Sequence, residues 1–216
     1  MKAKTKTKAL LMSLCAVLLV AASVLGTMAY LTDSKDVKNT FTVGNVSIDL
    51  DEAKVNTDGK AIDKKGNVVT DLAKAERVAE NSYKLLPGHT YTKDPIIHVD
   101  ANSEDCYLFV KVDSQIAAIE ANGNTTVAAQ MAAKGWKAVE GKDGIYVYVG
   151  TTAAPVAVNA NDNVTVFEQL VIAGTVNGDT LKTYENKTIT VTAYAVQKDG
   201  FEGKTADQIW STAFGA

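Results

Sequence analysis

One short run carries most of the information about the fold: Cys106-Tyr107-Leu108-Phe109-Val110-Lys111-Val112. It is rich in aromatic and β-branched residues, which favour strands, and its apolar residues do not alternate with polar ones. Such a run is typical of a β-strand that is buried on both faces. We therefore expect Cys106 to be a small buried hydrophobe, and the alternatives are a reactive thiol or a bridge between chains.

Further runs with strand character lie on both sides of this one. Gly141 and Gly144 separate two of them, which is typical of a β-hairpin. Gly44-Asn45 interrupts another and predicts a bend or bulge, while Asp94-Pro95 predicts an edge strand or a bulge because proline cannot donate to a ladder. The strand-like runs are residues 40–50, 90–99, 136–140, 145–149, 164–173 and 187–197.

Small helices are expected between the strands. Residues 115–134 are rich in alanine and predict two helical pieces, split by Asn122-Gly123-Asn124. Residues 205–214 predict a closing helix on which Trp210 and Phe214 share one face. Residues 51–82 form a polar excursion, with a helix-like patch at residues 72–80.

These short elements, separated by glycine and asparagine turns, fit a mainly β fold better than a parallel α/β design. The sequence predicts an antiparallel two-sheet sandwich with short helical insertions, in one domain that covers residues 40–216.

The first 29 residues have the features of a signal peptide. Four lysines precede an uncharged apolar run at residues 9–25, and Thr27 and Ala29 are the small residues that a signal peptidase reads. Cleavage after Ala29 would leave a chain beginning at Tyr30, so we expect an exported protein whose leader is only transiently inserted in the membrane. The alternative is an uncleaved membrane anchor, but no basic stop-transfer cluster follows the apolar run.

The charge of the expected mature chain argues against a nucleic-acid partner. Without the leader, 187 residues remain, with 18 basic and 25 acidic residues, which gives a net charge of about −7. Cys106 is the one cysteine left, so no intrachain disulfide is expected and stability must come from packing. No cofactor is expected.

Three segments together resemble a known family. They are Tyr30-Leu31-Thr32-Asp33-Ser34, which follows the leader, residues 39–50, and a segment that opens with the turn Leu86-Pro87-Gly88 and runs to residue 94. In order and content they are similar to the TasA/camelysin family of secreted bacterial proteins. Residues 188–197 and Ile209-Trp210 give weaker support.

This resemblance implies a jelly-roll-like sandwich, a leader cut by a SipW-type signal peptidase, and assembly into extracellular biofilm-matrix or pilus-like fibres at the cell surface. In fibre-forming members the mature N-terminal segment completes a sheet of the next subunit, which is donor-strand complementation. The implied partners are further copies of the chain, the signal peptidase, and accessory matrix or anchoring proteins.

Mapped onto this chain, the donor strand is an N-terminal extension at residues 30–39. Its candidate residues are Tyr30, Leu31, Thr32, Asp33 and Val37. An added strand gains main-chain hydrogen bonds while alternate side chains fill pockets, and Leu31 and Val37 lie on one face of such a strand. Asp33 interrupts that face, so a solvated tail is the alternative.

Camelysin-like proteins are often described as metallopeptidases, which gives a rival hypothesis. A zinc peptidase needs three protein ligands and a general base, but this chain has two histidines, His89 and His98, nine residues apart and outside any His-Glu-x-x-His arrangement. No serine lies in a Gly-x-Ser-x-Gly elbow. We therefore expect no catalytic and no metal-binding residues.

Two further hypotheses concern ligand binding. The oxygen-rich clusters at residues 49–52, 100–105 and 159–163 lack the spacing of a dedicated calcium loop, so we interpret them as solvated turns. Trp136, Tyr146 and Tyr148 on the predicted hairpin could form an exposed platform in a monomeric cell-surface binding module, although alternating tyrosines more often pack across strands.

Overall fold

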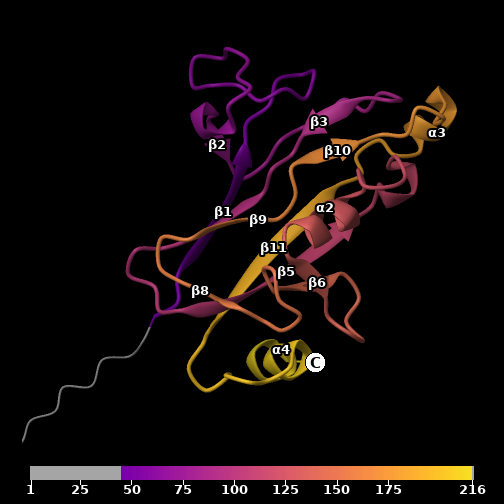
Figure 1. The fold of residues 1–216 in the computed structure, drawn as a ribbon. Helices are drawn as coiled ribbons and strands as arrows, with labels where there is room; N and C mark the ends of the chain where they lie inside the picture. Colours follow the sequence, from indigo (N-terminus) through magenta and orange to yellow (C-terminus); the bar gives the residue numbers. More distant parts are fainter. Residues whose placement is uncertain (1–44, 216) are drawn as a thin grey trace, which may run out of the picture. The chain divides into compact units, whose positions relative to one another are not determined.

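The structure is a computed structural model that describes residues 45–215 (Figure 1). These residues belong to one of two structural units into which the chain divides, residues 43–216. The leader, the processing site at Thr27, Ala29 and Tyr30, the donor-strand residues and the first part of the predicted strand at residues 40–50 lie outside the described residues. Within residues 45–215, no helix has the length and apolar character needed to cross a membrane.

The first sheet is built around the apolar run that opens at Cys106. β5 is buried on both faces from Cys106 to Val110, as predicted, but Lys111 is exposed and Val112 only partly buried. β5 pairs antiparallel with β11 over its whole length. On its other side β5 pairs with β7 and β8, and β7 pairs with β6 as the predicted hairpin. The strands are β5 (Cys106–Ser114), β6 (Trp136–Ala138), β7 (Ile145–Tyr148), β8 (Ala157–Val158) and β11 (Ile189–Gln197).

The second sheet has the strand order β2-β1-β4-β9. A separate two-stranded sheet pairs β3, which precedes β4 in the sequence, with β10, which follows β9. All pairs are antiparallel. The strands are β1 (Ile48–Ala53), β2 (Arg77–Val78), β3 (Thr90–Thr92), β4 (Ile96–Val99), β9 (Asn163–Thr165) and β10 (Gln169–Val171).

The predicted strands at residues 90–99 and 164–173 each break in two. Their register nevertheless continues across the break, because the Lys93 N–H donates to Glu168 O and the Val166 N–H donates to Pro95 O. Pro95 does not mark an edge strand, since β4 lies between β1 and β9. It lies at the break itself, where the ladder loses one donor while the Pro95 carbonyl still accepts from Val166.

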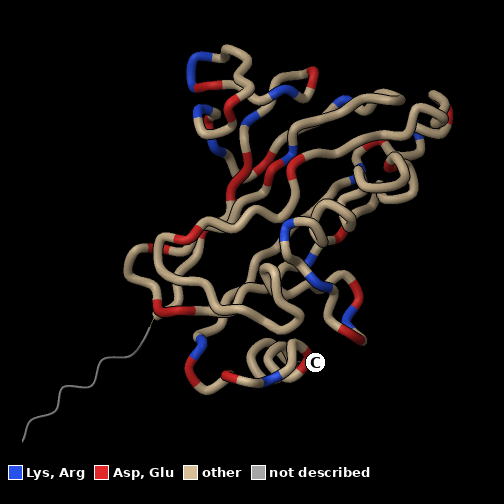
Figure 2. Tube along the Cα trace, viewed as in Figure 1, with Lys and Arg blue, Asp and Glu red and all other residues tan. Residues whose placement is uncertain are grey.

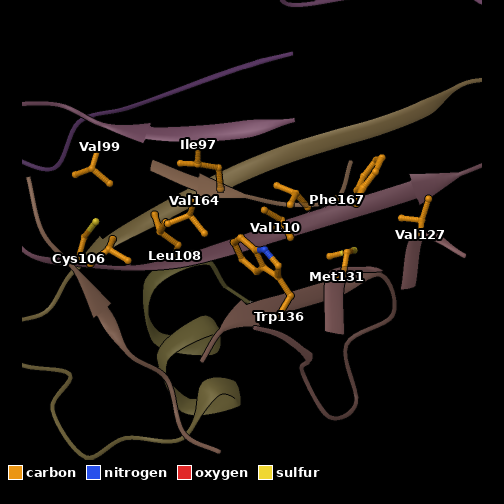
Figure 3. Close-up of a cluster of buried hydrophobic side chains, with 12 residues drawn as sticks. Ile97, Val99, Cys106, Leu108, Val110, Val127, Met131, Trp136, Val164 and Phe167 are labelled. Atoms are coloured by element: carbon orange, nitrogen blue, oxygen red, sulfur yellow. The ribbon is translucent and has the colours of Figure 1, made fainter. Parts of the chain in front are cut away.

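The main core lies between the two larger sheets (Figure 3). Ile97 and Val164 from the second sheet meet Leu108 and Val110 from β5, and α2 (Val127–Ala133) adds Met131. This arrangement confirms a mainly β, antiparallel sandwich with short helical insertions.

A second core lies on the other face of β5, where α4 (Ala206–Phe214) covers the sheet. The Phe109 and Trp210 rings lie 5.5 Å apart, and Trp210 contacts Phe214 at 4.9 Å, as their shared helical face predicts. Thr205 begins this helix with a capping box, in which its side chain and that of Gln208 each bond the other residue's backbone.

The predicted helical pieces at residues 115–134 form η2 (Ala117–Ile119) and α2. The helix-like patch at residues 72–80 is shorter than predicted: η1 (Leu72–Lys74) ends early, and Arg77–Val78 becomes β2. The chain there pairs with Glu52 and Ala53 of β1, and this tertiary pairing overrides the local helical preference. α3 (Gly178–Lys182) was not expected.

Candidate functional site

The outer edge of β11 is the feature that most clearly offers a binding site. The Gln115 N–H donates to Thr188 O, and the Lys198 N–H donates to Asp105 O. The backbone N–H and C=O groups of the even-numbered residues of β11 therefore point toward β5. The odd-numbered residues from Ile189 to Gln197 direct theirs the other way. No strand within residues 45–215 pairs with that side, so among the described residues β11 presents a nine-residue open edge.

The side chains along this edge are apolar and only partly buried. Ile189, Val191, Ala193 and Ala195 pack against the main core, yet each keeps an intermediate exposure. Their neighbour on β5, Val110, is completely buried. The predicted alternation of this strand is therefore correct, and a further strand beside β11 would complete the burial of its apolar face.

β1 lies across a groove from β11. Val46, Ile48 and Leu50 pack against the main core and are also partly buried. The Asp100 N–H donates to Ser47 O, which orients the backbone groups of Ile48 and Leu50 away from β4. The Leu50 N–H is satisfied by the Asp49 side chain at 2.9 Å, so this edge offers less to an added strand than β11 does.

An open groove of about 1070 Å³ lies where β1 and β11 approach each other. Leu50 and Val191 line its walls, and the excursion and α3 extend it with Tyr83, Leu85 and Leu181. The groove is lined by apolar and charged side chains and extends across several elements, with Ile189, Thr190 and Val191 as its part of β11. Such a surface is suited to an extended peptide, in which alternate side chains enter the groove.

A buried ionic network attaches the excursion to the sandwich beside this groove. Asp94 is 1% exposed, accepts from the Ala53 N–H at 2.7 Å and binds Arg77 Nη1 at 2.6 Å. Arg77 Nε donates to Asp51 Oδ1 at 2.8 Å. Figure 2 shows the acidic residues that gather along β1. The interpretation of residues 49–52 as a solvated turn is wrong, because Asp51 and Glu52 lie in β1 and bind cationic side chains.

The two histidines lie in different environments. His98 on β4 places Nε2 3.0 Å from Asp51 Oδ1 and Nδ1 2.5 Å from Asn163 Oδ1. His89, just before β3, places Nε2 2.9 Å from Asp58 O, and its ring lies against that of Tyr91 at a tilt of 56°, with 4.7 Å between the ring centroids. Within residues 45–215 no group of three or more His, Cys, Asp and Glu side chains is placed to hold a metal ion.

His98 makes stability depend on pH. Its partial burial disfavours the charged ring, but the hydrogen bonds to Asp51 and Asn163 and the charge of Asp51 outweigh this and raise the pKa of His98. A raised folded-state pKa gives stability that is complete below the unfolded pKa of about 6.5 and is lost as pH rises through the folded value. We expect the free energy of unfolding in urea to fall more between pH 6 and pH 8 for the wild type than for His98→Gln. The two falls should differ by less than about 1 kcal/mol, because the His98–Asp51 pair is partly exposed. An equal or larger difference in the variant would contradict this role.

Cys106 is completely buried in the main core, as predicted. Burial, with a smaller contribution from Asp105 and Asp162, raises the pKa of its thiol to about 11. The thiolate is the reactive form, so the native protein should resist a thiol reagent at neutral pH and react once it is unfolded. Absorbance with a disulfide reagent, with and without urea, measures this. Rapid reaction of the folded protein would show that β5 opens readily.

The hairpin does not present an exposed aromatic platform. Trp136 is 3% exposed and its Nε1–H donates to Thr165 O at 2.9 Å. Its ring contacts that of Tyr148, its partner across the strands, at 5.4 Å in a T-shaped arrangement. The platform hypothesis is therefore wrong for Trp136, and the alternative of cross-strand packing is confirmed. An indole needs a hydrogen-bond partner when it is buried, and Thr165 O supplies one.

The segment Leu86-Pro87-Gly88 forms the turn that leads into β3. Gly88 has a φ of +68°, a conformation that favours glycine. The Leu86 N–H donates to the hydroxyl of buried Tyr91 at 2.7 Å, and that hydroxyl donates to Lys84 O at 2.5 Å. Tyr91 of β3 thus binds the segment that leads into the turn.

The chain matches no protein-family model, no curated protein and no solved structure. The antiparallel sandwich and its open edge therefore carry the functional argument. Sequence reasoning identified the strand at residues 187–197 but did not find that this strand is the accessible edge. The pattern of this strand, with threonine on one face and small apolar residues on the other, is compatible with either an edge or a central position. Composition alone therefore did not identify the edge.

Proposed function

We propose that this protein is a secreted structural subunit that assembles into extracellular biofilm-matrix or pilus-like fibres by donor-strand complementation after leader removal. The observation that carries the proposal is the open edge of β11, whose outward backbone groups and partly exposed apolar side chains have no strand beside them within residues 45–215. Adding a strand there forms main-chain hydrogen bonds and covers apolar surface, two terms that both favour association.

The donor would be residues 30–39 of a second copy. This segment has ten residues, which suits the nine-residue edge of β11. Its apolar residues Leu31 and Val37 are six positions apart, the same spacing that separates Ile189 from Ala195. Asp33 and Lys35 lie between Leu31 and Val37 and carry opposite charges, so the donor face has no net charge to bury.

Leader removal would then control assembly. Before cleavage, residues 30–39 are joined through residues 26–29 to the apolar run at residues 9–25, which the membrane holds. After cleavage at Ala29 the donor has a free end and can enter the groove of a neighbour. Each subunit offers one donor and one acceptor, so the contact is head-to-tail and extends into a fibre.

A truncation tests this proposal directly. Protein beginning at Tyr30 should form fibres in negative-stain electron microscopy, whereas protein beginning at Thr40 should remain monomeric. A matched pair sharpens the test: Leu31→Asp changes the apolar face and should prevent assembly, while Thr32→Asp places the same charge on the opposite face and should be tolerated. Equal polymerisation of the truncated and full mature chains would show that residues 30–39 are not the donor.

A further inference from the structure

Glu52 lies between an amine and a carboxamide at the base of the excursion, where Glu52 and Lys93 are buried and Asn81 is half-buried. Its Oε2 is 2.7 Å from Lys93 Nζ, and its Oε1 accepts from Asn81 Nδ2 at 3.0 Å. Glu52 is 5% exposed and Lys93 is 8% exposed. The three side chains come from β1, from the segment after β2 and from the residue that follows β3, so the fold brings them together from different parts of the sequence.

The orientation of the Asn81 amide is fixed by two further contacts. Its Oδ1 accepts from the Val55 N–H at 2.9 Å, and its Nδ2 donates to Ala53 O at 2.9 Å. The carbonyl oxygen therefore faces a backbone donor of the kind that stabilises a developing oxyanion. The amide nitrogen faces a carboxylate that can supply a proton to a leaving group.

We propose that Lys93 and Asn81 form an intramolecular amide bond, with Glu52 as the proton carrier. Glu52 first takes a proton from the Lys93 ammonium, and the neutral Nζ attacks Asn81 Cγ. The negative charge that develops on Oδ1 faces the Val55 N–H. Glu52 then donates its proton to Nδ2 and takes one from Nζ. The Cγ–Nδ2 bond breaks and releases ammonia. The ammonia takes the proton that Glu52 has removed from Nζ and leaves as ammonium.

The atoms and charges balance without an external reagent. One ammonium group and one carboxamide become one amide and one ammonium ion, and Glu52 returns to its carboxylate form. The reacting groups need one movement, because the flexible four-carbon stem of Lys93 must carry Nζ from Glu52 to Asn81 Cγ. Tyr83 flanks this movement, with its ring centroid 5.8 Å from Nζ and its hydroxyl bonded to Thr92 O.

The new bond would join residues 81 and 93 and close the loop that carries the Leu86-Pro87-Gly88 turn. Crosslinks of this kind restrict the unfolded chain and so stabilise the folded one. The proposal does not depend on fibre formation, because all its groups belong to one subunit.

Mass spectrometry of the purified, folded protein tests the bond. For the chain that begins at Tyr30, we expect a mass lower by one ammonia molecule than the mass calculated from its sequence. Trypsin should leave residues 78–84 joined to residues 85–111, without cleavage after Lys93. A folded wild-type protein that has its full sequence mass and is cleaved after Lys93 would overturn the proposal, whatever the variants do.

Two substitutions assign the roles. Glu52→Gln retains the size and hydrogen-bonding capacity of the side chain but cannot carry the proton, so the ammonia loss should disappear. Lys54→Arg is the matched control, because Lys54 pairs with Glu76 at 3.1 Å in a more exposed position, and this variant should lose ammonia as completely as the wild type does. Full ammonia loss in Glu52→Gln would show that Glu52 is not the proton carrier.

Discussion

Replacement of Ala193 by proline is expected to abolish fibre formation and to leave the subunit folded. The Ala193 N–H points away from β5, so proline removes no hydrogen bond from the sheet. Proline is tolerated in edge strands at such positions. The same change removes a donor from the middle of the open edge and places a ring where an added strand would approach, and both effects oppose complementation.

Negative-stain microscopy and light scattering measure assembly in this variant, and circular dichroism measures its fold. Ala193→Thr is the matched control, because threonine keeps the N–H and favours strands, and this variant should still form fibres. Thr192→Pro should instead unfold or strongly destabilise the subunit, since the backbone of Thr192 faces β5 opposite Lys111. Fibres of Ala193→Pro that grow at the wild-type rate would show that assembly does not use this edge.

Replacement of Asp94 by alanine is expected to cause the largest loss of stability of any single change in the ionic network. It leaves the Ala53 N–H and the Arg77 guanidinium without their nearly buried partner. Breaking a buried pair by removing one member costs about 3–5 kcal/mol. For a chain of this size each kcal/mol lowers the melting temperature by roughly 2–4 °C, so the expected shift is easily measured.

Urea unfolding of Asp94→Ala and of Asp179→Ala makes the comparison. Asp179 pairs with Lys182 at 3.1 Å, but both side chains are largely exposed, and the cost of removing this pair should stay below about 1 kcal/mol. Similar small losses in both variants would mean that the network containing Asp94 does not hold the excursion to the sandwich.

The parts of the fold that follow from local patterns were predictable. The apolar run at Cys106 identifies the central strand β5, and Gly141 and Gly144 identify the hairpin of β6 and β7. The Trp210 and Phe214 spacing identifies α4. In each of these cases the residues that determine the structure are close together in the sequence.

Long-range pairing decided the features that the sequence did not reveal. Glu52 and Lys93 are 41 residues apart, and so are Ala53 and Asp94, so no local pattern indicates that they meet. β2 is a strand because β1 lies beside it, not because of its own composition. The open edge of β11 depends in the same way on which strands pair with β5, and this information is distributed over the whole chain.

Amide hydrogen exchange along β11 tests most directly whether this edge accepts the donor. In the monomer that begins at Thr40, the amides of Thr190, Thr192 and Tyr194 should be protected by β5, while those of Val191 and Ala193 should exchange quickly. In fibres of the chain that begins at Tyr30, all five should be protected. Fast exchange at Val191 and Ala193 in the fibres, or protection of both amides already in the monomer, would contradict donor-strand complementation at β11.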